Sequence, residues 1–140
     1  MSPTYPGSYP INLNCTFRFM GQPGERVKIH FRDFDVYSGG SHCPYDWMKV
    51  YDGAAPRLVD GHVVNLIGGA PICGEKHQVE LFSSRESLVA VFETSWSPRH
   101  ENRGFDGQFQ FSRNFVKLGS SVLPLAGFVD VAVCCHLLVY

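Results

Sequence analysis

The stretch from Arg26 to Phe34, RVKIHFRDF, alternates apolar and polar side chains more clearly than the stretches around it. The apolar residues at positions 27, 29 and 31 share one face, and the polar residues at positions 26, 28, 30 and 32 share the other. A period of two residues is typical of a strand with one face on the core and the other in water. RVKIHFRDF therefore predicts a half-buried strand of an antiparallel sheet.

Short strands separated by turns are predicted on both sides of this stretch. Segments of this character are NCTFRFMG (14–21), YDWMKVYDG (45–53), HQVELFSS (77–84), SLVAVFETSW (87–96) and FDGQFQFSRNF (105–115). In the last segment we expect Phe105, Phe109 and Phe111 to face inward. Residues 54–75 are irregular, and no segment has the pattern of an amphipathic helix. This spacing of strands and turns predicts an all-β sandwich.

Composition narrows the function classes. The chain has 140 residues, enough for one domain, and a net charge of −1. Proteins that bind nucleic acids usually carry a concentrated basic surface, so no nucleic-acid partner is expected. The first ten residues have neither the basic nor the apolar region of a signal peptide.

The C-terminal stretch differs in character, because residues 119–140 are nearly all apolar. About 20 apolar residues would span a membrane, but Pro124 interrupts this stretch and Asp130 lies within it. A charge at the bilayer centre costs at least about 2.5–3.5 kcal/mol, and the sequence leaves membrane attachment open. We expect residues 1–116 to form the domain and residues 117–140 to be an apolar tail, a non-native or truncated end.

Several motifs occur in the order that is characteristic of one family of extracellular domains. They are the Tyr-Pro entry SPTYPGSYPINLNC, a Phe-x-x-Phe-Asp strand, Cys-x-Tyr-Asp, a Tyr-Asp-Gly turn, Cys-Gly and a closing Gly-Phe. Over residues 2–115 the chain thereby resembles a CUB domain. The resemblance implies an antiparallel, jelly-roll-like β-sandwich of the extracellular space, here lacking its first strand.

Two longer strings, residues 25–53 and 101–118, resemble a CUB domain of the suppressor-of-lurcher proteins. These are invertebrate transmembrane proteins with several CUB domains, auxiliary to ionotropic glutamate receptors of the AMPA type. The resemblance implies a non-catalytic protein–protein interaction module whose partner is such a receptor, in a parent protein at the extracellular face of the plasma membrane. The alternative is a regulatory or substrate-binding CUB domain of a multidomain extracellular protease. A third possibility is a truncated product without function.

The resemblance also makes the five cysteines interpretable. CUB domains typically join the cysteine of Cys-x-Tyr-Asp to that of Cys-Gly, which implies a disulfide between Cys43 and Cys73. Cys15 matches the second cysteine of the family's first pair, whose partner would lie upstream of Met1, so Cys15 is expected to be unpaired. A bond from Cys15 to the Cys134-Cys135 pair in the tail is not expected.

Many CUB domains bind calcium through a tyrosine, a glutamate and two aspartates. By motif, Tyr9 and Asp46 match the tyrosine and one aspartate, but Tyr37 and Ser95 stand where the other two carboxylates would be. Calcium prefers six to eight oxygen ligands, so we expect no calcium site and no other cofactor. The expected role of Asp46 is to accept hydrogen bonds from loop backbone and to hold Tyr9.

The remaining candidates lie on the surface. The sequence contains no nucleophile elbow, zinc-protease helix or phosphate loop, so we expect no enzyme activity. Tyr37, Trp96 and Arg99 are candidates for partner binding, because aromatic residues and arginine are enriched at interaction hot spots. The basic edge that Arg99 forms with Arg103 is usually just solvated surface. Asn14, in Asn-Cys-Thr, is a weak candidate for glycosylation.

Overall fold

Ten strands and one short 3-10 helix form the described part of the chain, which comprises residues 1–95, 101–113 and 130–137 of a computed structural model. The strands are β1 (Leu13–Met20), β2 (Arg26–Val36), β3 (Trp47–Asp52), β4 (Leu58–Val59), β5 (His62–Val63), β6 (Gly74–Lys76), β7 (Val79–Phe82), β8 (Ser87–Glu93), β9 (Gly104–Ser112) and β10 (Asp130–Leu137). The helix η1 spans Ile67–Gly69. The prediction of an all-β fold is confirmed.

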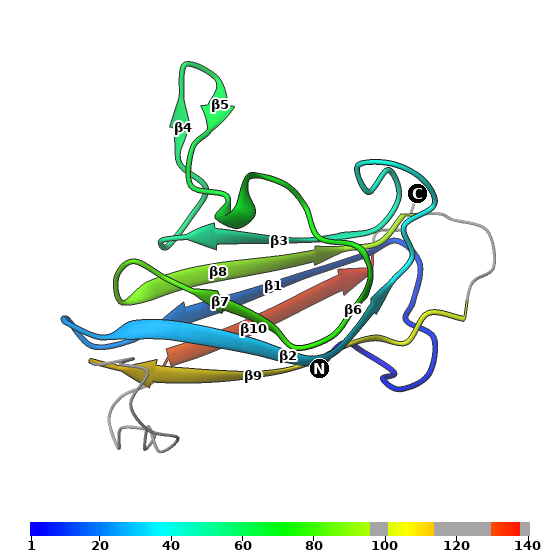
Figure 1. Ribbon diagram of the computed structural model, residues 1–140, viewed down its shortest axis with the longest axis horizontal. Coiled ribbons are helices and arrows are strands. Elements are labelled where there is room, and N and C mark those ends of the chain that lie inside the picture. Colours follow the sequence, from blue (N-terminus) through cyan, green and yellow to red (C-terminus); the bar gives the residue numbers. More distant parts are fainter. Residues whose placement is uncertain (96–100, 114–129, 138–140) are drawn as a thin grey trace.

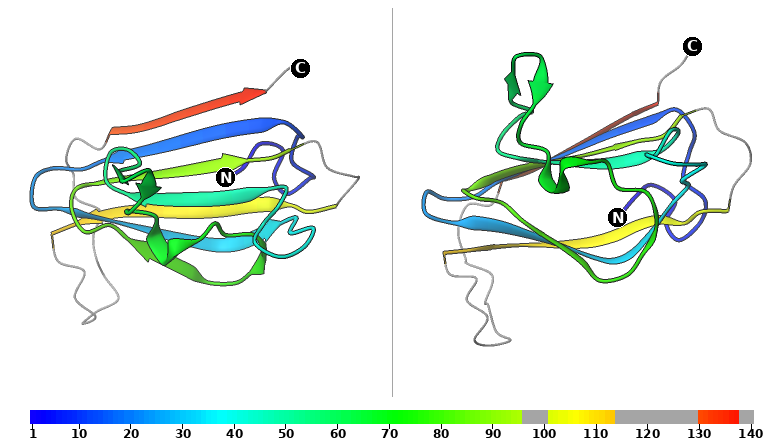
Figure 2. Two further views of the ribbon diagram at one scale, coloured as in Figure 1. Left: turned by 90° about the horizontal axis from the view of Figure 1, so that it is seen from above. Right: turned by 45° about the horizontal axis from the view of Figure 1, so that its top comes forward.

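The strands form two antiparallel sheets that face each other, and a small hairpin stands apart from them (Figures 1 and 2). One sheet has the order β10-β1-β8-β3. In the other, β2 pairs with β6, β7 and β9, and the hairpin is β4-β5. Each of the six strand segments predicted from alternation overlaps one strand of these two sheets.

Strand β2 shows why the alternation works and where it changes. The predicted inward residues Val27, Ile29 and Phe31 are between 0% and 4% exposed. The register against β9 shifts between Phe31 and Asp33, so one extra residue is inserted. A β-bulge of this kind reverses which parity faces the core. Phe34 and Val36 are therefore also fully buried, at 0% exposure.

The core lies between the two sheets and is rich in aromatic contacts. The ring centroids of Phe92 and Phe105 are 5.0 Å apart in an edge-to-face arrangement. Phe105 and Phe111 are buried as predicted, but Phe109 is 47% exposed. Phe109 does contact Phe19, at 5.2 Å between ring centroids, yet strand β9 pairs only with β2 among the described strands. The expectation for Phe109 is therefore only half right, because its strand lies at an open edge.

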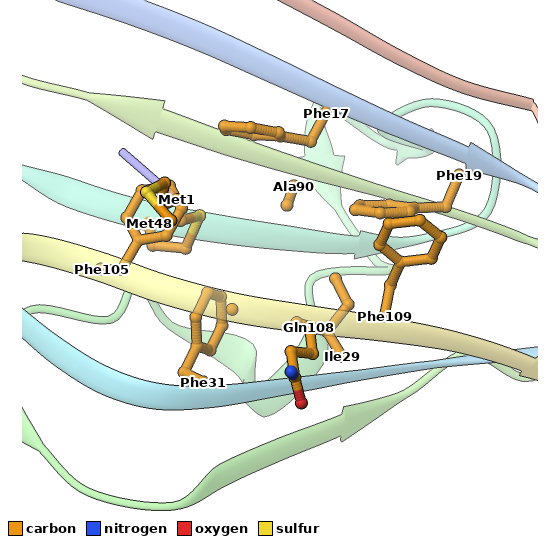
Figure 3. A pocket seen from close by; sticks show the side chains of 11 residues that line it. Met1, Phe17, Phe19, Ile29, Phe31, Met48, Ala90, Phe105, Gln108 and Phe109 are labelled. Carbon is orange, nitrogen blue, oxygen red and sulfur yellow. The ribbon is translucent and has the colours of Figure 1, made fainter. Parts of the chain in front are cut away.

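An apolar cavity of about 160 Å³ lies at this open side (Figure 3). Phe17 and Phe19 from β1 line it from one sheet, and Phe105 and Phe109 from β9 line it from the other. Met1 also contributes to the lining. The two layers therefore do not close completely on the β1–β9 side.

Strand β10 corrects the expectation about the C-terminal stretch. Asp130–Leu137 pairs antiparallel with β1 along its whole length, so this part of the expected tail is an edge strand of the sheet. No helix in the described ranges is long and apolar enough to cross a membrane. Whether the stretch is a non-native end stays a prediction.

Cys15 is disulfide-bonded, so the prediction that it is unpaired is wrong. Its partner lies outside the side chains that the structure describes. The backbone register places Cys15 opposite Cys135 of β10. The physical reason for the error is that β10 occupies the edge of β1, where an upstream strand was expected to supply the partner.

The N-terminal Tyr-Pro segment folds back onto the start of β9. Ser2 N donates to Phe105 O at 2.9 Å, and Ser2 Oγ accepts from Phe105 N at 3.0 Å. Gly104 has a φ of +90°, and a Cβ there would collide with Ser2 Oγ. The Gly-Phe motif thus marks the place where the entry segment is tied to the sandwich.

Candidate functional site at the start of strand β3

Four residues from distant parts of the chain meet just before β3. We call this group, Tyr9, Tyr37, Asp46 and Ser95, the Asp46 corner. Tyr9 Oη donates to Asp46 Oδ2 at 2.6 Å, and Ser95 N donates to Asp46 Oδ1 at 2.9 Å. Tyr37 N in turn donates to Tyr9 Oη at 2.9 Å. Asp46 is 0% exposed, so this network joins three chain segments around a buried carboxylate.

The electrostatics of the corner keep Tyr9 protonated. Burial raises the pKa of the Tyr9 hydroxyl well above its usual range, and the hydrogen bond to Asp46 raises the pKa further. The hydroxyl therefore remains a donor to the carboxylate at every physiological pH. This agrees with the role for Asp46 expected from the sequence, in which it accepts loop hydrogen bonds and holds Tyr9.

The oxygen atoms of this corner are engaged in hydrogen bonds within the protein. Asp46 is the one carboxylate among the four, and both of its oxygens already accept hydrogen bonds. No group of three or more histidine, cysteine, aspartate or glutamate side chains that could hold a metal occurs in the part of the chain that the structure describes. Calcium prefers six to eight oxygen ligands, so a calcium site here would need further oxygen atoms from outside these four residues.

The loop between β2 and β3 presents aromatic rings beside the corner. The rings of Tyr37 and Tyr45 stack with centroids 5.8 Å apart and an interplanar angle of 27°. Gly39 lies against both rings at a φ of +61°, where a Cβ would collide with Tyr45. Tyr45 remains 39% exposed. We call residues 37–46 the aromatic loop.

A disulfide anchors this loop from the other side. Cys43 and Cys73 are bonded, as the resemblance implied, with their Cα atoms 5.7 Å apart. The bond ties the aromatic loop to the segment before β6, while Asp46 ties it to Tyr9 and Ser95. Hydrogen bonds hold Tyr37 and Asp46 at the two ends of the loop, and the disulfide adds an anchor at Cys43, so Tyr45 is displayed on a rigid base.

The structure describes some of the other predicted site residues and not all of them. Trp96 and Arg99 lie outside the described residues, so their role in partner binding stays a prediction. Tyr37 is at the corner, as described above, and is partly buried. Asn14 lies within β1, between β8 and β10, and its glycosylation is not tested.

Arg103 is the residue that sequence reasoning undervalued. Arg103 Nε and Nη2 donate to the two carboxylate oxygens of Asp33, each at 2.9 Å, and Arg103 Nη1 lies 3.3 Å from Asp35 Oδ2. Tyr5 Oη also donates to Asp33, at 2.7 Å. The Arg103 hydrogen bonds lower the pKa of Asp33 to about 2. Spacing alone does not indicate this network, because it joins β2 to a loop about 70 residues later.

The fold and the corner together define a β-sandwich module that displays loops from a rigid end. The chain belongs to the CUB domain family, whose family model matches residues 1–109. CUB domains are protein-interaction modules of extracellular proteins and are not catalytic themselves.

The curated relatives support this assignment. Human neuropilin-2 is 34% identical over 113 residues, which are 77% of this chain and 11% of neuropilin-2. The dorsal-ventral patterning protein tolloid of Drosophila melanogaster is 42% identical over 108 residues, which are 77% of this chain and 9% of tolloid. The chain thus spans about a tenth of the length of these relatives. They show the family but give no specific support to the suppressor-of-lurcher resemblance.

Solved structures agree. The CUB1-EGF-CUB2 domains of human MASP-1/3 match with a TM-score of 0.66 and 26% identity, covering 79% of this chain and 39% of the other. The MASP-1 CUB2 domain bound to Ca²⁺ matches with a TM-score of 0.59 and 27% identity, covering 77% and 86%. The second of these structures is bound to Ca²⁺.

Proposed function

We propose that this chain binds a protein partner through the aromatic loop, as the interaction module of an auxiliary protein of AMPA-type glutamate receptors. The observation that carries the binding role is Tyr45. Its ring is exposed, stacked on Tyr37 and placed beside the hydrogen-bonded Asp46 corner. A rigid aromatic side chain binds at low entropic cost, because its conformation is already set before the partner arrives.

The choice of partner rests on the sequence. Residues 25–53 and 101–118 carry the strings that resemble suppressor-of-lurcher CUB domains. The first string contains the whole aromatic loop. The part of the chain that points to the receptor auxiliary proteins is therefore also the part that presents the exposed ring.

One finding favours the second candidate, a CUB domain that regulates a protease or binds its substrate. The zinc metalloproteinase nas-39 of Caenorhabditis elegans is 34% identical over 108 residues, 77% of this chain. The genomic sequence flanking this chain distinguishes the two proposals. A neighbouring zinc or serine protease domain would exclude the receptor proposal, and further CUB domains with one membrane span would favour it.

Binding to the extracellular region of an AMPA-type receptor tests the proposal directly. In biolayer interferometry with the immobilised receptor region, we expect Tyr45→Ala to weaken binding at least about tenfold, as at an interaction hot spot. Phe82→Ala is the matched control. Phe82 is also an aromatic residue and is 38% exposed, but it lies in strand β7, outside the aromatic loop. Absence of wild-type binding, or equal losses in the two variants, would contradict the proposal.

A further inference from the structure

The β4-β5 hairpin exposes an unusual concentration of apolar side chains. Leu58, Val59, Val63 and Val64 are 64%, 49%, 42% and 47% exposed. These are four of the ten large hydrophobic side chains that are exposed among the described residues, and they lie within seven positions. Figure 1 shows the hairpin standing clear of both sheets. Clustered exposure of this kind marks an interaction site far more often than scattered exposure does.

The apolar side chains occupy both faces of the hairpin. Leu58 pairs with Val63, and Val59 pairs with His62, so neighbouring pairs point to opposite faces. A flat partner surface would cover only one of these faces. A partner that covers both must receive the hairpin in a cleft.

The root of the hairpin is held firmly. The Asn65 side-chain amide donates to Asp52 O at 3.0 Å and to Ala55 O at 2.9 Å, and its oxygen accepts from Arg57 N at 2.7 Å. Tyr51 and Leu66 form an antiparallel bridge just below. An isolated two-stranded hairpin is only marginally stable, so this network fixes the direction in which it projects.

A cleft lies beside this root, between the hairpin and the turn from β7 to β8. Its volume is about 740 Å³, and Ala54, Pro56 and Val64 supply apolar lining. Arg57 and Arg85 also line it, and both are exposed. The acidic residues of the lining, Asp52 and Glu86, are only partly exposed, and the Asp52 carboxylate accepts hydrogen bonds from Ser84.

The tip and the cleft have complementary charges. The turn of the hairpin carries Asp60, which is exposed. Within the described ranges, none of Asp60, Arg57 and Arg85 has an ion-pair partner. The hairpin thus presents an acid between apolar side chains, and the adjacent cleft presents two arginines in a lining that is mainly polar and partly apolar.

We propose that two copies of this chain associate through this end, with the hairpin of each copy in the root cleft of the other. Asp60 of one copy then faces Arg57 and Arg85 of the second, and Leu58 and Val63 cover its Ala54 and Pro56. The same contact occurs twice around a two-fold axis, as in isologous dimers. The exchange covers both faces of each hairpin. It is independent of the receptor proposal, because it uses the opposite end of β3.

Sedimentation velocity of the wild-type chain measures this association. Because the surface is small, we expect a dissociation constant on the order of 10 µM. The double variant Leu58→Ser/Val63→Ser should weaken the association at least about tenfold. Ile11→Ser is the control, because Ile11 is 44% exposed elsewhere and should leave the dimer unchanged.

Charge reversal sharpens the test. Asp60→Lys and Arg85→Glu should each weaken self-association at least about tenfold, since each places like charges together in both contacts. Mixed in equal amounts, the two variants should associate again. In the mixed dimer, the reversed tip meets the reversed cleft, and the native tip meets the native cleft.

A wild-type chain that stays monomeric up to about 500 µM, well above the expected constant, would overturn the proposal. So would a dimer that the serine variant leaves intact, or charge-reversed variants that fail to associate on mixing. Each variant is first compared with the wild type by circular dichroism and thermal unfolding. None of these outcomes bears on receptor binding, so the two proposals fail separately.

Discussion

The two ends of strand β3 use polar and apolar side chains in opposite ways. At its start, a buried carboxylate, Asp46, is satisfied by Tyr9 and Ser95 and joins three segments. Beyond its end, apolar side chains such as Leu58 stand in water on a hairpin with a firm root. The first arrangement stabilises the fold, and the second leaves surface for a partner. The comparison teaches that a polar side chain can stabilise the fold when it is buried, and that an apolar one can be left for binding when it is exposed.

The largest effect is expected at the start of β3. Asp46→Ala leaves one buried donor, Tyr9 Oη, and one partly buried donor, Ser95 N, without their acceptor, and should cost about 3–5 kcal/mol of the free energy of unfolding. Urea denaturation measures this loss in the free energy of unfolding. Asp52→Ala is the matched control, because Asp52 also accepts two hydrogen bonds but lies partly exposed, and it should cost less than about 1 kcal/mol. Equal costs would break the comparison.

Removal of the disulfide at the same end of β3 should have the next largest effect on the free energy of unfolding. The bond between Cys43 and Cys73 closes a loop with a sequence separation of 30. In the chain-entropy model, replacing both cysteines by serine lowers the free energy of unfolding by about 3–4 kcal/mol. The wild-type chain under reducing conditions should lose more than this, because reduction also breaks the disulfide of Cys15. A loss below about 1 kcal/mol would mean that the Asp46 corner holds the loop by itself.

Acid sensitivity should come from Asp33. Its pKa in the folded chain is about 2, below its ordinary value of 3.8, chiefly because Arg103 donates to it. The stabilisation is therefore fully present above about pH 4 and is lost as the pH falls through about 2. Arg103→Gln should raise the midpoint of acid unfolding by up to about one pH unit. A variant with the wild-type acid profile would show that Arg103 is only solvated surface.

The hairpin should contribute almost nothing to stability in dilute solution. Leu58→Ala should change the free energy of unfolding by less than about 0.5 kcal/mol, because its side chain is 64% exposed. Leu88→Ala, at 0% exposure in β8, should cost about 2–5 kcal/mol. Thermal and urea unfolding of the two variants measure the difference between their losses of stability. A large loss for Leu58→Ala would place the hairpin in the structural core instead.

The smallest expected effect is that of calcium. Addition of millimolar Ca²⁺, or of a chelator, should leave the unfolding temperature unchanged within error, because the Asp46 corner already satisfies its carboxylate. Titration calorimetry should show no saturable heat. A sub-millimolar affinity that Asp46→Ala abolishes would show that the corner rearranges to take the ion.

Much of the sandwich could be predicted, because alternation reports burial directly. The strands β1, β2, β3, β7, β8 and β9 follow from runs of alternating side chains. The Cys43–Cys73 bond followed from the resemblance of motifs. The hairpin β4-β5 was not predicted. Its apolar residues are exposed and packed on no core, so they do not alternate with polar residues along the chain. The role predicted for Asp46 is consistent with the structure, because Tyr9 and the backbone of Ser95 donate to its carboxylate.

The local sequence sets which residues can face a core and where turns interrupt the strands. The other features depend on contacts between distant segments, which form only in the folded chain. The bulge after Phe31 brought Phe34 inside, the pairing of β10 with β1 placed a strand opposite Cys15, and an open edge left Phe109 half exposed. Hydrophobic alternation is a property of neighbours along the chain, whereas register, edges and buried polar networks are properties of the packed whole.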